Sequence, residues 1–206
     1  MALGDSYVSA AALKSFLGIS DTTDDTLLTA AANAATERVN QFCQRQFNQT
    51  TTSSDRTYVP RDCWTVEVDD FHTTTGLVVA TDTNDDGTYA TTWTSADYVL
   101  HPFDGIESGE TGWPYRKIVA VEDLTFPART GRPRVRVTAQ WGWAEIPESV
   151  TLATKLIAAL LFNLKDSPLG VASFGESGLI RVRDVPQAAM LLEKYQHPAT
   201  TGPLVA

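Results

Sequence analysis

The sequence predicts an α+β fold, with a helical bundle formed by N- and C-terminal helices and an inserted antiparallel β module. Apolar residues recur at helical spacing near the start of the chain. The middle is rich in Thr, Val, Trp and Tyr with Gly and Pro at intervals, which is typical of strands and turns. A helical pattern then returns. We therefore expect helices in 1–47, a β-rich module in 48–144, helices that pack back on the first segment in 145–196, and a tail in 197–206.

Two helices are expected before the β module. Ser9 is a good N-cap and Gly18 a good stop for a short first helix. The second runs from Asp25 to about Gln46, where apolar residues recur at helical spacing and polar residues occupy the other faces. The apolar positions are Leu27, Leu28, Ala31, Ala35, Val39 and Phe42.

Seven short segments of the middle region have strand composition. They are Arg56–Val59, Thr65–Val68, Gly76–Thr81, Thr92–Thr94, Tyr98–His101, Ile118–Val121 and Arg134–Gln140. The segment from Asp82 to Gly87 begins like a calcium-binding loop, but Trp93 stands where that loop needs a glutamate. We interpret it as a hairpin turn, because Asp, Asn and Gly are turn residues. The Gly-, Pro- and acid-rich segment 104–114 is expected to be a long loop.

The helix predicted over Val150–Leu164 is apolar on nearly every side, so it must be covered all round. We expect neighbouring copies of the chain to provide that cover, with Leu152, Leu156, Ala159 and Leu160 at the subunit interface. Arg134 and Arg136 share one face of a strand and are assigned to the same interface, where they would meet an acidic protein surface. A solvated strand face and a DNA backbone contact are the alternatives.

The helix after Pro147 is expected to end near Pro168, because proline cannot continue a helix. Pro186 suits the first position of a last helix, which is predicted over Gln187–Tyr195.

Charge and composition exclude several classes of protein. The chain has 206 residues and a net charge of −9, which argues against a simple nucleic-acid binder. Residues 1–110 hold 5 Lys/Arg and 17 Asp/Glu, whereas residues 111–206 hold 11 and 8. Such halves suit head-to-side stacking in a ring or docking on a partner of opposite charge, although a plain solvated surface explains the distribution equally. The run at 150–164 is broken by Lys155 and too short to span a bilayer, so we expect no membrane.

We expect no enzyme, no cofactor and no metal. The three histidines show no ligand or triad spacing, and neither a P-loop nor a dinucleotide fingerprint is present. The acidic pairs at 69–70 and 122–123 have adjacent carboxylates, which point to opposite faces of a strand. Cys43 is expected to be a small buried hydrophobe, and the two cysteines fit synthesis in a reducing cytoplasm. Trp141 and Trp143 are expected to be core anchors.

The segment Tyr7–Ile19, followed by Asp24–Leu28, resembles the opening of head–tail connector proteins of long-tailed bacteriophages, also called adaptor or head-completion proteins. The run Trp141–Pro147, the apolar helix, and the phrases Asp166–Gly170 and Gly178–Val182 resemble versions from phages of actinobacteria. The resemblance covers both helical ends, about half of the chain, and matches the β region less well.

The resemblance implies a virion protein, made in the host cytoplasm, that forms a ring of usually twelve copies beneath the portal. Such a ring extends the DNA channel and carries the next stopper or tail-terminator protein. Its partners would be the portal protein, neighbouring copies, that downstream protein, and genomic DNA that passes without sequence-specific contact. The C-terminal region would meet the portal. The portal-contact residues implied by position are Pro168, Leu169, Phe174, Arg181, Arg183, Met190, Leu191, Tyr195 and His197.

Two other functions compete with this one. The first is a β-sandwich module of a virion or cell surface that binds carbohydrate or protein, with Trp64, Trp93 and Trp113 as stacking platforms. The second is a hydrolase with paired carboxylates, which lacks a coherent acid–base pair.

Overall fold

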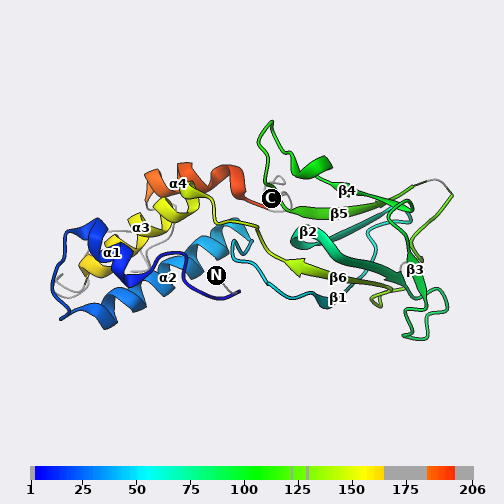
Figure 1. The fold of residues 1–206 in the computed structure, drawn as a ribbon, viewed down its shortest axis with the longest axis horizontal. Helices are drawn as coiled ribbons and strands as arrows, with labels where there is room; N and C mark the ends of the chain where they lie inside the picture. Colours follow the sequence, from blue (N-terminus) through cyan, green and yellow to red (C-terminus); the bar gives the residue numbers. More distant parts are fainter. Residues whose placement is uncertain (1–2, 122, 129, 165–184, 198–206) are drawn as a thin grey trace, which may run out of the picture. The chain divides into compact units, whose positions relative to one another are not determined.

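The computed structural model describes residues 3–121, 123–128, 130–164 and 185–197 (Figure 1). Its contacts divide the chain into two units. The β unit comprises Met1–Leu3 and Asn48–Glu145, and the helical unit comprises Gly4–Phe47 and Ile146–Ala206. Helices from both ends of the chain and an antiparallel sheet from its middle confirm the predicted α+β fold.

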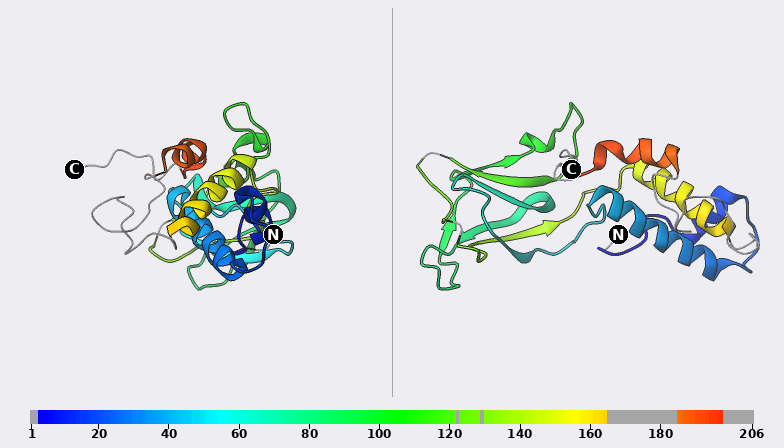
Figure 2. Two further views of the ribbon diagram at one scale, coloured as in Figure 1. Left: turned by 90° about the vertical axis from the view of Figure 1, so that its left-hand side faces the viewer. Right: turned by 180° about the vertical axis from the view of Figure 1, so that it is seen from behind.

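The helical unit is built from segments that lie far apart in the sequence. Its described elements are α1 (Ala10–Leu17), α2 (Asp25–Cys43), α3 (Glu148–Asn163), α4 (Pro186–Leu192) and the 3-10 turn η5 (Glu193–Tyr195). The predicted ends of α1 are confirmed, since the Ser9 hydroxyl accepts the Ala12 N–H and Gly18 adopts a φ of 71°. Pro186 begins α4 as predicted. Figures 1 and 2 show α3 lying between α2 and α4.

Most of α3 is covered within its own chain. It contacts α1, α2 and α4, and it buries Val150, Ala153, Ile157 and Phe162 against them. The expectation that neighbouring copies must supply the cover was therefore wrong for this face. Helical periodicity shows that a helix is apolar all round, but it does not show how many helices of the same chain surround it.

Aromatic residues close the end of the bundle. The Phe47 ring meets Tyr7 and Tyr195 edge-on, at centroid distances of 5.8 and 5.7 Å. The Tyr7 hydroxyl accepts the Phe47 backbone N–H at 2.9 Å and donates to the Asn40 side chain. Burial raises the pKa of Tyr7 to about 12, so this hydroxyl stays neutral and keeps its proton for donation.

The two cysteines should differ sharply in reactivity. Cys43 is buried, as predicted, and burial raises the pKa of its thiol to about 12, whereas Cys63 is exposed. Because only a thiolate attacks alkylating reagents, the native chain should incorporate one iodoacetamide at pH 8 within minutes, and two only in denaturant. Intact mass spectrometry measures this, and Cys63→Ser should reduce native labelling to zero. Native labelling of both thiols would contradict the buried position of Cys43.

The β unit contains a six-stranded antiparallel sheet in the order β1-β6-β2-β5-β4, and β3 also pairs with β2. The strands are β1 (Ser54–Tyr58), β2 (Thr65–Thr81), β3 (Thr91–Trp93), β4 (Tyr98–His101), β5 (Tyr115–Ala120) and β6 (Val135–Trp141). A 3-10 turn, η1 (Phe103–Gly105), follows β4. The core of the β unit contains apolar residues from several strands, among them Val66, Phe71, Val79, Ile118, Val137 and Trp141.

One strand differs from the prediction. The segments Thr65–Val68 and Gly76–Thr81, expected as two strands, are the ends of the single strand β2. Its pairing with β5 and β6 shifts register between Glu67 and Val78. Apart from Phe71, the intervening residues 69–75 are polar and lack the alternation of a half-buried strand, so their composition resembled a connection. Register shifts of this kind bend a strand without ending it.

The segment after β2 is a turn, as predicted. The carboxylate of Asp82 accepts the backbone N–H groups of Asp86 at 3.3 Å and Gly87 at 2.8 Å. Burial tends to raise the pKa of the Asp82 carboxyl, but these hydrogen bonds and the positive charge of Arg134 outweigh it. The pKa therefore lies below its usual value, and the turn is held by an ionised carboxylate at neutral pH.

Candidate interaction surfaces

The candidate functional sites are exposed surfaces of the described residues. No three His, Cys, Asp or Glu side chains within residues 3–121, 123–128, 130–164 and 185–197 are grouped to hold a metal ion. Asp69 pairs with Arg56 at 2.6 Å, and the Asp70 carboxylate accepts the indole N–H of Trp143 at 3.0 Å. Both carboxylates are therefore engaged in structural contacts. None of the helices traced here has the length and apolar character needed to cross a membrane.

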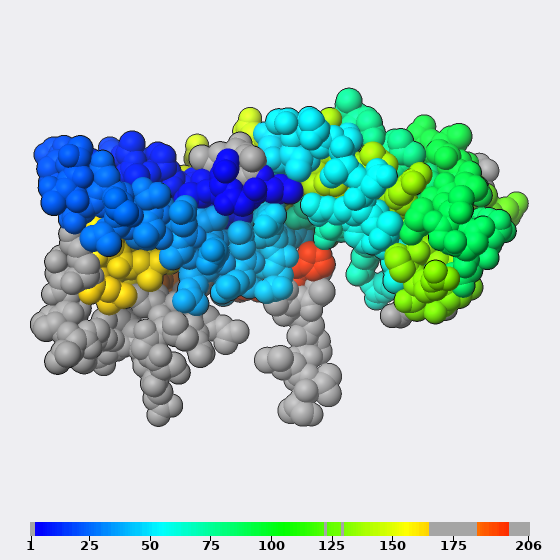
Figure 3. Space-filling model, turned by 90° about the horizontal axis from the view of Figure 1, so that it is seen from below, coloured from blue at the N-terminus to red at the C-terminus, as the bar shows by residue number. Residues whose placement is uncertain are grey.

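A row of apolar side chains remains on α3 after the helices of its own unit have packed. Leu152 is 42% exposed, and Leu156, Ala159 and Leu160 are half-buried. The three leucines are four residues apart, so they share one stripe of the helix. Part of α3 (gold) reaches the surface beside α2 (blue) in Figure 3. All four residues assigned from the sequence to a subunit interface on this helix thus retain accessible surface.

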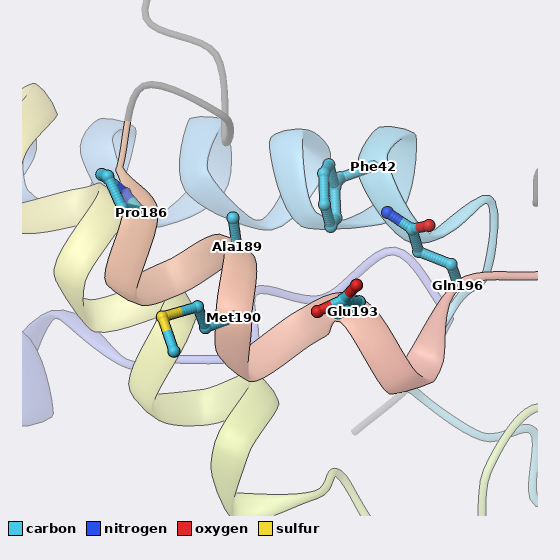
Figure 4. A pocket seen from close by; sticks show the side chains of 6 residues that line it. All are labelled: Phe42, Pro186, Ala189, Met190, Glu193 and Gln196. Carbon is cyan, nitrogen blue, oxygen red and sulfur yellow. The ribbon is translucent and has the colours of Figure 1, made fainter.

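A groove of about 440 Å³ lies in the helical unit between α2 and the C-terminal segment. Its lining residues are Phe42, Pro186, Ala189, Met190, Glu193 and Gln196 (Figure 4). Figure 4 shows Phe42 on α2 facing the segment that carries Glu193 and Gln196. Met190 is 77% exposed, so most of this large apolar side chain faces solvent at the rim of the groove.

The residues implied as portal contacts fall into three groups. Met190 is exposed and Leu191 is half-buried, so both present surface. Tyr195 is buried against Phe47, and the backbone N–H of the half-buried His197 donates to the Cys43 carbonyl at 2.9 Å. Tyr195, which was assigned to the portal contact by its position in the C-terminal segment, is therefore a core residue. Pro168, Leu169, Phe174, Arg181 and Arg183 lie outside the described residues.

The two arginines assigned to the subunit interface have different environments. Arg134 is buried, and its guanidinium donates to the carbonyls of Asp82 (2.9 Å), Thr83 (2.8 Å) and Ala128 (3.2 Å). It holds the turn after β2 in place and offers little surface to a neighbouring subunit. Arg136 is half-buried, with its Nε 3.8 Å from a carboxylate oxygen of Asp55.

The tryptophans do not form a stacking platform for carbohydrate. Trp93 is buried and stacks on Phe126 at a centroid distance of 4.5 Å. Trp113 is buried against Trp143 at 5.1 Å, and Trp141 and Trp143 are buried as predicted. Of the three proposed platform residues only Trp64 is exposed. The reading of Trp93 and Trp113 as ligand platforms was wrong, because aromatic residues between strands serve the core first.

Sequence reasoning missed two exposed apolar residues, Phe103 and Ile106, in the loop after β4. That segment was interpreted only as a long loop. The available signal was the presence of large apolar side chains beside the acidic residues of a connection that has no sheet or helix to pack them.

Comparison with known proteins gives a partial family match and a shared fold. Residues 9–96 match the family described as phage gp6-like head-tail connector protein. A chain from the neck of an empty GTA particle, computed with C6 symmetry, is similar in structure, with a TM-score of 0.52 and 16% sequence identity. The alignment covers 92% of this chain and 89% of that chain. Because the sequence identity is low, the similarity shows a shared fold and nothing more. No protein with a curated description matches the chain.

The family match spans α1, α2 and the first strands of the β unit, and it ends before the C-terminal motifs that suggested actinobacterial phages. It includes part of the β region, which had seemed to match less well. The opening motif from Tyr7 was thus interpreted correctly. Over residues 9–96, less than half of its length, the chain is similar to the phage gp6-like head–tail connector proteins.

Proposed function

We propose that this chain is a structural protein of a phage neck, where copies of it form a ring beneath the portal, join capsid to tail and extend the DNA channel. The family match over residues 9–96 is the observation that carries the proposal. The fold shared with a chain of a GTA particle neck supports it. The ring would be made in the host cytoplasm and would hold a downstream stopper or tail-terminator protein.

The ring contact is assigned to the apolar row of α3. Leu152, Leu156, Ala159 and Leu160 form one stripe, and a stripe of this kind suits packing against another helix. A heterologous contact, in which this stripe meets a different surface of the next copy, closes into a ring when the rotation between copies is right. Arg136 stays in the proposed interface because part of it is accessible, whereas Arg134 does not.

The portal contact is assigned to the groove beside α4. Met190 and Leu191 supply an adaptable apolar rim, and Phe42 supplies an aromatic wall. Genomic DNA would pass such a ring without sequence-specific contact, because a net charge of −9 repels phosphates rather than binding them.

Single charges placed on these surfaces separate the two contacts. Leu152→Asp should abolish rings in negative-stain images of the chain mixed with its portal, since a buried, unpaired carboxylate is strongly unfavourable in an interface. Met190→Asp should weaken portal binding, measured by co-sedimentation, by about tenfold or more for the lost apolar anchor. Leu27→Asp is the matched control, because Leu27 is 50% exposed on α2 and belongs to neither surface.

Circular dichroism melts check that each variant folds. Rings that form equally well with Leu152→Asp would contradict the assigned subunit contact. Wild-type chain that neither assembles nor binds the portal would contradict the neck function itself.

A further inference from the structure

We propose that the loop from Phe103 to Gly112, called the apolar loop, docks into an apolar pocket rimmed by Lys or Arg on a different protein of the particle. The inference rests on the neck function proposed above and adds a partner surface to it. It concerns the β unit alone, whose role the family match leaves open.

The apolar loop presents two large apolar side chains to solvent. Phe103 is 56% exposed and Ile106 is 46% exposed, and the neighbouring Val99 on β4 is exposed as well. Surface connections usually carry polar side chains, and exposed apolar side chains gathered in one place mark a contact with another molecule.

The loop is also held firmly in shape. Glu107 accepts two hydrogen bonds from the guanidinium of Arg116, at 2.6 and 2.7 Å, in a half-buried bidentate pair. The backbones of Glu107 and Glu110 exchange two hydrogen bonds, and the Trp113 N–H donates to the Gly105 carbonyl at 3.0 Å. A loop fixed in this way loses little conformational entropy when it binds, which favours docking without rearrangement.

A groove of about 500 Å³ adjoins the loop. Phe103 and Asp104 line its side toward the loop, and the aromatic side chains of Trp93, Tyr98 and Tyr115 line other parts. The apolar loop projects beside this groove, so the surface is shaped to interlock with a partner. The Phe103 and Ile106 side chains would enter the partner, and a side chain of the partner would enter the groove.

Charge selects the kind of partner. Asp104 and Glu110 are exposed beside the apolar side chains, and the neighbouring Arg116 is paired with Glu107. The β unit as a whole holds 8 Lys/Arg and 15 Asp/Glu, a net of −7, and the helical unit holds 8 and 10, a net of −2. DNA would bring more negative charge to the loop, and neither unit of a second copy carries a net positive charge. A different protein with a basic rim fits both the charge and the apolar tip.

Photo-crosslinking in assembled particles tests the inference. A full-length chain with benzoylphenylalanine in place of Phe103 should crosslink to one particle protein other than itself, at a peptide that contains Lys or Arg. Adding Asp104→Lys and Glu110→Lys should lower the crosslink yield by about tenfold, because the charge complementarity is reversed. The same crosslinker at Leu124, another exposed residue of the β unit, should give no such product.

Each other outcome has a definite meaning. Crosslinks to further copies of this chain or to DNA, or equal yields at Leu124, overturn the inference. So does a chain that is present in the particle but gives no crosslink from the loop, and in that case the neck function stands. Particles that lack the chain contradict the neck function and the inference together. Thermal unfolding of each variant shows whether it retains the native fold.

Discussion

Replacement of Gly142 by alanine is expected to destabilise the β unit more than any other single methyl group added to the described glycines. A Cβ built at Gly142 would lie 1.7 Å from the backbone carbonyl oxygen of Asn48 and 2.8 Å from its carbon. Backbone atoms cannot swing aside as a side chain can, so two chain segments must move apart. Gly142 also has a φ of 95°, which side-chain-bearing residues rarely adopt.

The expected cost is about 2–6 kcal/mol, from backbone strain and overpacking of about 1–3 kcal/mol each. This is a large part of the stability of an ordinary domain. Urea unfolding followed by tryptophan fluorescence measures it, since Trp141 and Trp143 flank the site and are buried.

Gly87→Ala is the matched control for this substitution. Gly87 lies in the same unit with a similar φ of 86°, but nothing lies within 4 Å of its added Cβ. We expect this variant to lose only about 1 kcal/mol, the conformational part of the effect. Equal losses in the two variants would show that the close approach of Asn48 does not matter.

Replacement of Arg134 by methionine is expected to have the second large effect. Methionine retains the apolar stem but removes the three hydrogen bonds to the carbonyls of Asp82, Thr83 and Ala128. A hydrogen bond from a charged group contributes about 1.5–3 kcal/mol, so a loss of roughly 3–5 kcal/mol is expected after water reaches some of the carbonyls. Urea unfolding measures the loss.

Arg132→Met controls for the removal of charge. Arg132 is exposed and, among the described residues, reaches the Asp85 carbonyl at 3.2 Å and its carboxylate at 4.0 Å. Exposed pairs contribute little, so its loss should stay within about 1 kcal/mol. A similar loss for both arginines would contradict a special role of the buried one.

Lowering the pH should reduce the difference in free energy of unfolding between the wild type and Arg134→Met. The pKa of Asp82 is lower in the folded chain than in the unfolded chain, and Arg134 contributes to this depression. The stabilisation is present above the unfolded pKa and is lost as the pH falls through the folded value. The wild type has more of this stabilisation to lose. The urea unfolding curves of the two proteins should therefore move closer together as the pH is lowered.

Local signals allowed the helices and most strands to be predicted from the sequence. Ser9 and Gly18 bracket α1, and Pro186 begins α4, because each acts through its own backbone geometry. The alternation around Val135 and Val137 identified β6 for the same reason. Such features depend on neighbouring residues and are readable without a fold.

The surfaces depended on contacts between distant segments, which the sequence does not display. Arg134 was assigned to an interface because it shares a strand face with Arg136. Its buried position beside the Asp82 turn arises only when β2 and β6 pair. Trp93 was assigned to a ligand platform because the sequence does not show that its ring stacks on Phe126. The assignments of Leu152 and Met190 to exposed helix faces agree with the structure, in which both are accessible. They could be made from the sequence because helical spacing indicates which side chains share a face.

The hydrogen bond from the Trp143 N–H to the Asn48 carbonyl, at 3.1 Å, joins the beginning and the end of the inserted segment. The ends of roughly one hundred intervening residues are thus neighbours, the arrangement in which whole domains tolerate insertion elsewhere. Because its two ends are adjacent, the inserted segment has the geometry of a unit that can be exchanged as a whole.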